Sequence, residues 1–239
     1  MAVNKYNFRW MYLQNFQTAV DYFAKILSEK VIPGFERLPE EADALAQEVY
    51  KKLGMSFDPD HDDPADSAEA AQHAGISFYM MASGMKQGII NLFTAGLYHF
   101  FEQTFFKFHR RELLWPPDND KDPSLIKWRP AKDRLIKYYG IDIEKFSSWA
   151  KVNELRLLAN TVKHADGDSC TELKGLRPDL FVSTHGQTER YELELVRVRP
   201  VLQPLAGEDV YINPEELAKY VEAVKMFWEE LATAFDGIE

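Results

Sequence analysis

The sequence predicts a mainly α-helical protein, a helical bundle with a small β-hairpin placed before the C-terminal helix. Three observations support this fold class. Apolar residues recur every three or four positions through most of the 239 residues. Prolines and glycines stand where these periodic stretches end. Strand-like alternation is confined to the region around 181–198. We therefore expect a single helical domain over 1–239, with 181–212 as a small β accessory segment.

Two helices are expected in the first quarter of the chain. The first spans 13–30 and stops before Pro33, which cannot continue a helix interior. The second spans 39–54 and begins with Pro39, since proline is favoured in the first turn of a helix. The acidic stretch that follows, 56–67, is broken by prolines and is expected to form an exposed loop.

A long helix is expected over 69–113, with apolar residues on nearly every side, as in a helix at the centre of a bundle. Glycine is unfavourable inside a helix but allows another segment to approach closely. The glycines of this stretch therefore predict either a break or a close contact near one of them; they are Gly75, Gly84, Gly88 and Gly96.

Two further helices are expected before the hairpin. One spans 130–139 and ends at Gly140. The other begins with Asp142 as its N-cap, continues to about residue 165 and stops at Gly167.

The last quarter of the chain combines the predicted hairpin with a closing helix. Residues 181–184 and 190–198 are rich in strand-forming residues and are separated by a turn-like stretch. Asn213 and Glu216 then provide an N-cap and a capping box, and an apolar stripe continues to Phe235.

Composition limits the classes of function. The formal net charge of −10 opposes broad nonspecific attraction to phosphate backbones or anionic lipid. The lone Cys170 excludes an intramolecular disulfide and a cysteine-based zinc cluster, so a reducing, cytoplasmic location is expected. The most apolar stretch, 76–108, is interrupted by charges, and no export signal or membrane span is predicted. We expect neither a cofactor nor a metal, because the motifs that bind them are missing.

One helix face carries residues suited to RNA chemistry. Arg156, Asn160 and His164 are spaced four apart and therefore share one side of their helix, and Lys163 projects nearby as a candidate substrate contact. A histidine that exchanges protons, an arginine that holds phosphate and an asparagine that orients a hydroxyl suit metal-independent RNA cleavage. The alternative is an ordinary exposed face, with His164 stabilising the helix C-terminus.

The segment ELRLLANTVKHADG, preceded by a helical partner containing LYHFFEQ, resembles the HEPN group of small helical proteins. That signature is Arg, four to six residues, then His, commonly with Asn directly after the Arg. Asn160 and His164 keep this relation, whereas Ala159 stands in place of the Arg and Arg156 lies one turn earlier.

The resemblance implies a bundle that often dimerises and an RNase or RNA-binding component of a bacterial defence or toxin module. Arg156, Asn160 and His164 would then be the catalytic residues, and RNA and a second copy of the chain would be the partners. The displaced Arg leaves open the alternative of a non-enzymatic helical module for protein–protein interaction.

The acidic loop is a second candidate site. Between Asp58 and Glu69 the acids match the spacing of a twelve-residue calcium loop. Asp63, however, occupies the sixth position, where the sharp turn requires glycine, and Pro64 follows it. We therefore expect no tight calcium binding.

The remaining candidates each have a structural explanation. His99 and Glu102 are either an acid/base pair or a satisfied buried contact. The basic run 109–111 suits a helix end, and Cys170 lacks an identifiable histidine partner that would activate it. A basic hairpin edge, formed by Arg190, Arg197 and Arg199, is also what a protected edge strand looks like.

Overall fold

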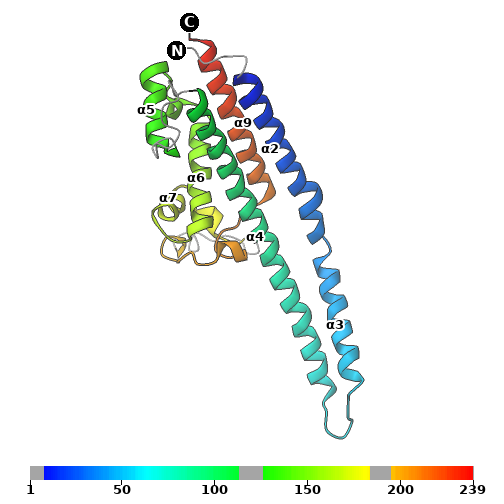
Figure 1. Ribbon diagram of the computed structural model, residues 1–239. Helices are drawn as coiled ribbons and strands as arrows, with labels where there is room; N and C mark the ends of the chain where they lie inside the picture. Colours follow the sequence, from blue (N-terminus) through cyan, green and yellow to red (C-terminus); the bar gives the residue numbers. More distant parts are fainter. Residues whose placement is uncertain (1–7, 113–125, 184–194, 239) are drawn as a thin grey trace.

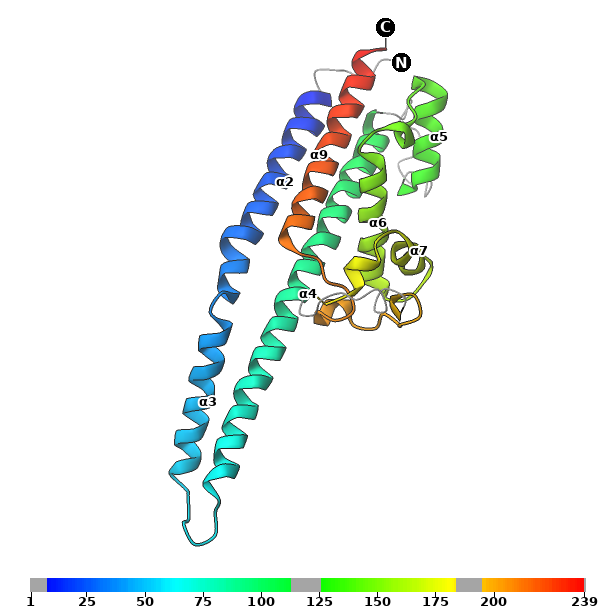
Figure 2. The same cartoon turned by 180° about the vertical axis from the view of Figure 1, so that it is seen from behind.

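The computed structural model describes residues 8–112, 126–183 and 195–238. Throughout these residues the regular structure is helical and contains no strand, which confirms the mainly α prediction. Figure 1 shows a body of helices lying side by side and an arm of two helices that projects from it, and Figure 2 shows the same division from behind.

The body is built from α2 (Asn15–Ile26), the C-terminal half of α4 (Pro64–Glu112), α6 (Trp149–His164) and α9 (Pro214–Asp236). Its centre is aromatic. The ring of Phe227 meets that of Phe101 edge-on, with centroids 4.9 Å apart, and Trp228 is fully buried among the surrounding rings. Edge-to-face contacts of this kind add to the burial of the rings themselves, so the aromatic cluster fixes how the body helices pack.

The first helical segment is longer than the predicted 13–30. Helical turns continue from η1 (Arg9–Gln14) through α2 to η2 (Leu27–Val31) and η3 (Ile32–Phe35). Phe8, Tyr12, Phe16 and Val20 repeat every four residues and are buried, which explains the early start.

The arm consists of α3 (Leu38–Gly54) and the N-terminal half of α4, joined by a turn over 55–63. The two helices approach closely through small residues: a Cβ added at Gly75 would lie 2.8 Å from the carbonyl oxygen of Ala42. The exposed loop expected over 56–67 is shorter than predicted, because Pro64 already belongs to the first turn of α4.

α4 is continuous over its 49 residues, about 73 Å at the usual rise per residue. Its glycines therefore do not break it, and the predicted close contact is confirmed. The turn η7 (Pro204–Ala206) packs directly on α4, where a Cβ at Gly88 would lie 2.1 Å from the carbonyl oxygen of Leu205. A side chain at this position would collide with the turn.

The predicted β-hairpin is not seen. At its two ends, Phe181 completes η6 (Pro178–Phe181) and residues 195–196 are helical; residues 184–194 lie outside the described residues. The following segment, 199–213, is irregular, and the buried amide of Asn91 on α4 donates to the carbonyl oxygens of Pro204 (2.7 Å) and Val210 (2.9 Å). Two backbone carbonyls of the predicted accessory segment 181–212 are thus satisfied by a side chain.

Between α4 and the irregular segment lie α5 (Trp128–Tyr139), η5 (Ile143–Lys145), α6 and α7 (Asp168–Leu176). Gly140 ends α5 with φ 68°, as predicted. Asp142, predicted to cap a helix running to residue 165, instead accepts from the Glu144 amide and caps η5; α6 starts later, at Trp149.

The predicted cap of the closing helix is confirmed, because the Asn213 side chain accepts from the Glu216 amide at 2.7 Å. Among the described helices, none is both long enough and apolar enough to cross a membrane.

Candidate functional site

α7 divides the polar face of α6 that the sequence singled out. Gly167, predicted as a helix stop, directly precedes α7, which lies beside α6 in Figure 1. The Asn160 amide donates to the Ser169 hydroxyl across the two helices at 3.3 Å, and Leu173 is fully buried. Two hollows result, and the described residues that line one do not line the other.

The larger one, here called the Arg156 hollow, has a volume of about 510 Å³. Three aromatic rings, three cations and two carboxylates lie around it, together with Val152 and Asn153. They are Tyr98, Trp128 and Trp149; Arg129, Lys132 and Arg156; and Glu144 and Glu172.

Buried contacts hold the aromatic wall in place. The Trp128 indole N–H lies 2.9 Å from Glu102 Oε1, and its ring stacks on Phe105 with centroids 4.5 Å apart. The Tyr98 hydroxyl donates to the same carboxylate at 2.9 Å. Burial, followed by the nearby Glu102 charge, raises the pKa of Tyr98 far above its usual range, so this hydroxyl stays protonated.

The cations differ in how they are held. Lys132 pairs with Glu144, and its ammonium lies 5.7 Å from the centre of the Trp149 ring. Arg156 donates through Nε to Asn153 Oδ1 at 2.9 Å. Within the described residues, its other two guanidinium nitrogens form no hydrogen bond or ion pair, and neither does the guanidinium group of Arg129. This arrangement can hold an anionic group beside an aromatic surface.

The smaller hollow, of about 280 Å³, contains Asn160 and His164. His164 is the last residue of α6 and is exposed, as is Lys163. Cys170 also lines this hollow, but its side chain is buried, and burial raises the pKa of its thiol to about 11. The thiol is therefore protonated near neutral pH and is a poor nucleophile.

The predicted trio is thus brought together only in part. Asn160 and His164 share a hollow, whereas Arg156 lines another. His164 lies eight positions after Arg156 along one helix, about 12 Å of axial rise.

The weaker candidates have local partners. His99 Nδ1 lies 3.4 Å from Glu102 Oε2, and Glu102 also anchors Tyr98 and Trp128, as a satisfied contact would. His109 lies in the last turn of α4 with Arg110 and Arg111, as the predicted basic cluster at a helix end; its side chain is buried, with Nε2 2.7 Å from Arg134.

At the acidic turn, the carboxylates cap their own backbone. The Asp58 amide donates to Asp62 at 2.8 Å, and the Asp60 amide donates to Asp58 at 3.0 Å. Asp66 and Glu69, which would be the later ligands, belong to α4. Across the described parts of the chain, no three His, Cys, Asp or Glu side chains gather so as to hold a metal ion.

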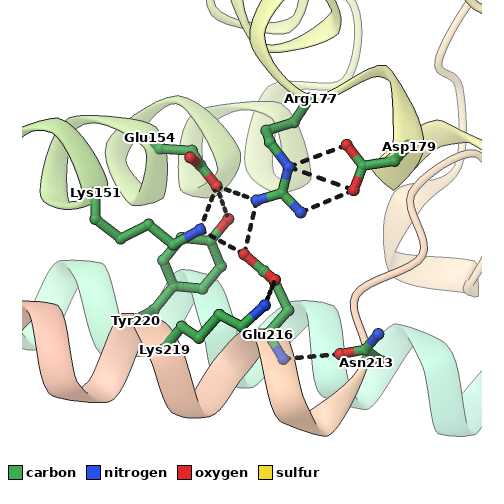
Figure 3. A network of polar contacts seen from close by, with 8 residues as sticks. All are labelled: Lys151, Glu154, Arg177, Asp179, Asn213, Glu216, Lys219 and Tyr220. Carbon is green, nitrogen blue, oxygen red and sulfur yellow. Dashed lines mark hydrogen bonds and ion pairs between the residues drawn. The ribbon is translucent and has the colours of Figure 1, made fainter.

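An ionic network centred on the buried Glu216 carboxylate, not foreseen from the sequence, joins α6, the end of α7 and α9 (Figure 3). Arg177 donates to Glu216 at 2.6 Å and also pairs with Glu154 and Asp179, while Lys151 contacts both Glu154 and Glu216. Desolvation opposes ionisation of Glu216, but hydrogen bonds from Arg177, Lys151 and Lys219 lower its pKa to about 2. The network is occupied by its own side chains and holds α7 in place.

Comparison with known proteins gives no relative: no family model, curated protein or solved structure matches the chain.

The sequence did offer signals for what was missed. Trp128 is followed directly by Arg129, and both line the Arg156 hollow, so this pair of neighbours was one signal of a cationic aromatic site. Gly167 and Asp168 supply a short boundary and an acidic first turn for α7. Neither signal shows that α5, α6 and α7 converge on one hollow.

Proposed function

We propose that this chain is a HEPN-like RNA-binding protein whose phosphate-holding centre is the Arg156 hollow. The observation that carries the proposal is the meeting of three cations, which outnumber the two carboxylates, with three aromatic rings around one hollow, in a chain whose net charge is −10. Arginine binds phosphate through a planar fork of donors, and bases of any sequence stack on aromatic rings.

Cleavage within this proposal requires a second copy of the chain. The reaction is attack of an RNA 2′-hydroxyl on the adjacent phosphate, which forms a 2′,3′-cyclic phosphate and breaks the bond to the 5′-oxygen of the next nucleotide. His164 takes the proton from the 2′-hydroxyl and returns a proton to the leaving 5′-oxygen, while Arg156 holds the phosphate and Asn160 orients the site. Because Arg156 and His164 of one chain line different hollows, a twofold dimer would have to bring His164 of one copy to the Arg156 hollow of the other.

RNA binding is tested by fluorescence anisotropy with a labelled single-stranded RNA of mixed sequence, in the presence of a chelator. We expect Arg156→Ala to weaken binding at least about tenfold, the loss of roughly one charge-assisted contact. Arg37→Ala is the matched control. Arg37 is exposed, directly precedes α3 and lies outside the hollow, and its substitution removes the same charge. No binding by the wild type, or equal losses in both variants, would overturn the proposal.

Cleavage is tested separately on total RNA with chelator present. We expect the wild type to cut and His164→Ala to be inactive while still binding RNA. Cleavage that survives His164→Ala would refute the assigned chemistry and leave RNA binding standing.

A helical protein–protein interaction module is the second candidate function. It is favoured by the arm, whose large apolar side chains are exposed beyond the body. It becomes the better account if no RNA binds.

A further inference from the structure

The apolar row that packs α4 into the body continues along the arm without a cover. At 100° per residue, Ile76, Met80, Gln87, Thr94 and Phe101 lie within about 60° of one another around α4. From Gln87 onward the row is covered: its amide donates to the Ile212 carbonyl at 2.9 Å, and Thr94 and Phe101 are fully buried. Toward the tip the same row is open, with Ile76 47% and Met80 68% exposed.

One further large apolar side chain flanks this open part of the row: Tyr79, 38% exposed, lies about 60° from Ile76. Met81 and Met85, 70% and 61% exposed, lie about 140° and 180° from Ile76 and belong to another side of α4. Ile76, Tyr79 and Met80 thus form one exposed apolar face within five positions of the helix. Contiguous exposed apolar surface marks an interaction site, and methionine adapts its shape to different partners.

Charge decides which partner suits this face. Residues 38–86 carry ten acidic and three basic side chains, a net −7 of the chain's −10. Pairing two arms would bring two such charges together, which disfavours a second copy. A partner that presents cations around an apolar stripe complements both features.

We propose that the arm binds a cationic amphipathic helix of a partner protein along the face of α4 formed by Ile76, Tyr79 and Met80. The partner helix covers the open row with its apolar stripe, and its lysines or arginines are attracted by the acidic charge of the arm, a net −7 over residues 38–86. This surface is separate from the Arg156 hollow and does not depend on RNA binding; it gives the interaction-module function a definite site.

The probe is a labelled helical peptide of leucine and lysine, about 18 residues long, with its leucines on one face. A scrambled peptide of the same composition controls for charge alone. Binding is followed by fluorescence anisotropy at low and physiological salt. We expect micromolar affinity for the amphipathic peptide, at least about tenfold weaker binding of the scrambled one, and weaker binding as salt rises.

The matched variants are Ile76→Glu with Met80→Glu on the arm, and Val198→Glu on the body, where Val198 is 78% exposed. All three positions are exposed, so each variant is expected to keep the wild-type circular dichroism and melting temperature. The arm variant should lose at least about tenfold in peptide affinity, and the body variant should keep it.

The reverse change tests the charge argument. Glu41→Lys with Asp43→Lys leaves the apolar row intact and should weaken binding of the cationic peptide. Equal binding of the scrambled peptide, equal losses in arm and body variants, or no binding by the wild type would overturn the proposal. So would light scattering that shows a dimer of the wild type and a monomer of the arm variant, since the face would then be occupied by a second copy.

Discussion

α4 runs through both the body and the arm, but its apolar row is covered in the body and exposed in the arm. In the body, α4 is surrounded by α2, α6 and α9, and its apolar row disappears into an aromatic core. Toward the tip of the arm, α3 is the one helix of the described residues that runs beside α4, and the same row faces outward. A continuous periodic pattern thus specifies a helix over its whole length but does not say how many neighbours will cover it.

The largest expected effect is a difference in stability between substitutions in the covered and the exposed half of the row. Phe101→Ala removes a fully buried ring and should lower the free energy of unfolding by about 3–5 kcal/mol. Met80→Ala, at an exposed position of the same row, should change it by less than about 0.5 kcal/mol. Urea denaturation followed by circular dichroism measures both. Similar losses in the two variants would mean that the arm row is covered.

A smaller effect is expected where the body closes on α4. Gly88→Ala places a methyl group against the Leu205 carbonyl and should cost about 1–3 kcal/mol through the shift it forces. Gly54→Ala, at the end of α3 with open space around it, should be neutral or slightly stabilising. Thermal unfolding of the two variants compares them; a neutral Gly88→Ala would contradict the close contact.

The ionic network provides a pH-dependent comparison. Because the pKa of Glu216 falls from 4.5 to about 2, its contribution is present above about pH 5 and is lost as the pH falls toward 2. We expect Glu216→Gln to cost about 1–2 kcal/mol at neutral pH and to flatten the acid dependence of stability.

Glu69→Gln on the arm is the control for that change. Glu69 pairs with His73, and both side chains are 72% exposed, so its removal should have little effect. If Glu69→Gln altered the acid dependence of stability as much as Glu216→Gln does, the network could not be its source.

The smallest expected response is that of the arm tip to calcium. Asp58 and Asp62 already accept from backbone amides of the turn, while Glu69 belongs to α4. Isothermal titration should therefore detect no micromolar calcium binding. Micromolar affinity that disappears in an Asp58→Ala, Glu69→Ala double variant would make the tip a metal site.

Sequence periodicity was enough to predict much of the fold. The stripe from Leu217 to Phe235 and the Asn213 cap predicted α9, and the glycines of α4 predicted a close approach. These features depend on neighbours within a few residues or on one small side chain. The hairpin expected at 181–198 is not seen at its described ends, and most of its span, 184–194, lies outside the described residues. In the segment that follows, Asn91, more than a hundred positions away, binds two backbone carbonyls, a contact that no local pattern indicates.

The candidate site was less predictable for the same reason. Spacing correctly placed Arg156, Asn160 and His164 on one helix, with Val152 and Leu155 on its buried side. It gave no sign that α7 would pack between them, nor that Trp128 from α5 would approach Arg156. Both depend on contacts between helices rather than on the pattern within one.

The most direct test of the separation between arm and body is hydrogen exchange measured by mass spectrometry. Two portions of one protein preparation are compared, one with RNA and the other with the cationic amphipathic peptide. RNA should slow exchange around Trp128 and Arg156 and leave 76–85 unchanged, whereas the peptide should slow exchange in 76–85 and leave the hollow unchanged. Protection of the arm by RNA, or of the Arg156 hollow by the peptide, would contradict the assignment of two independent surfaces.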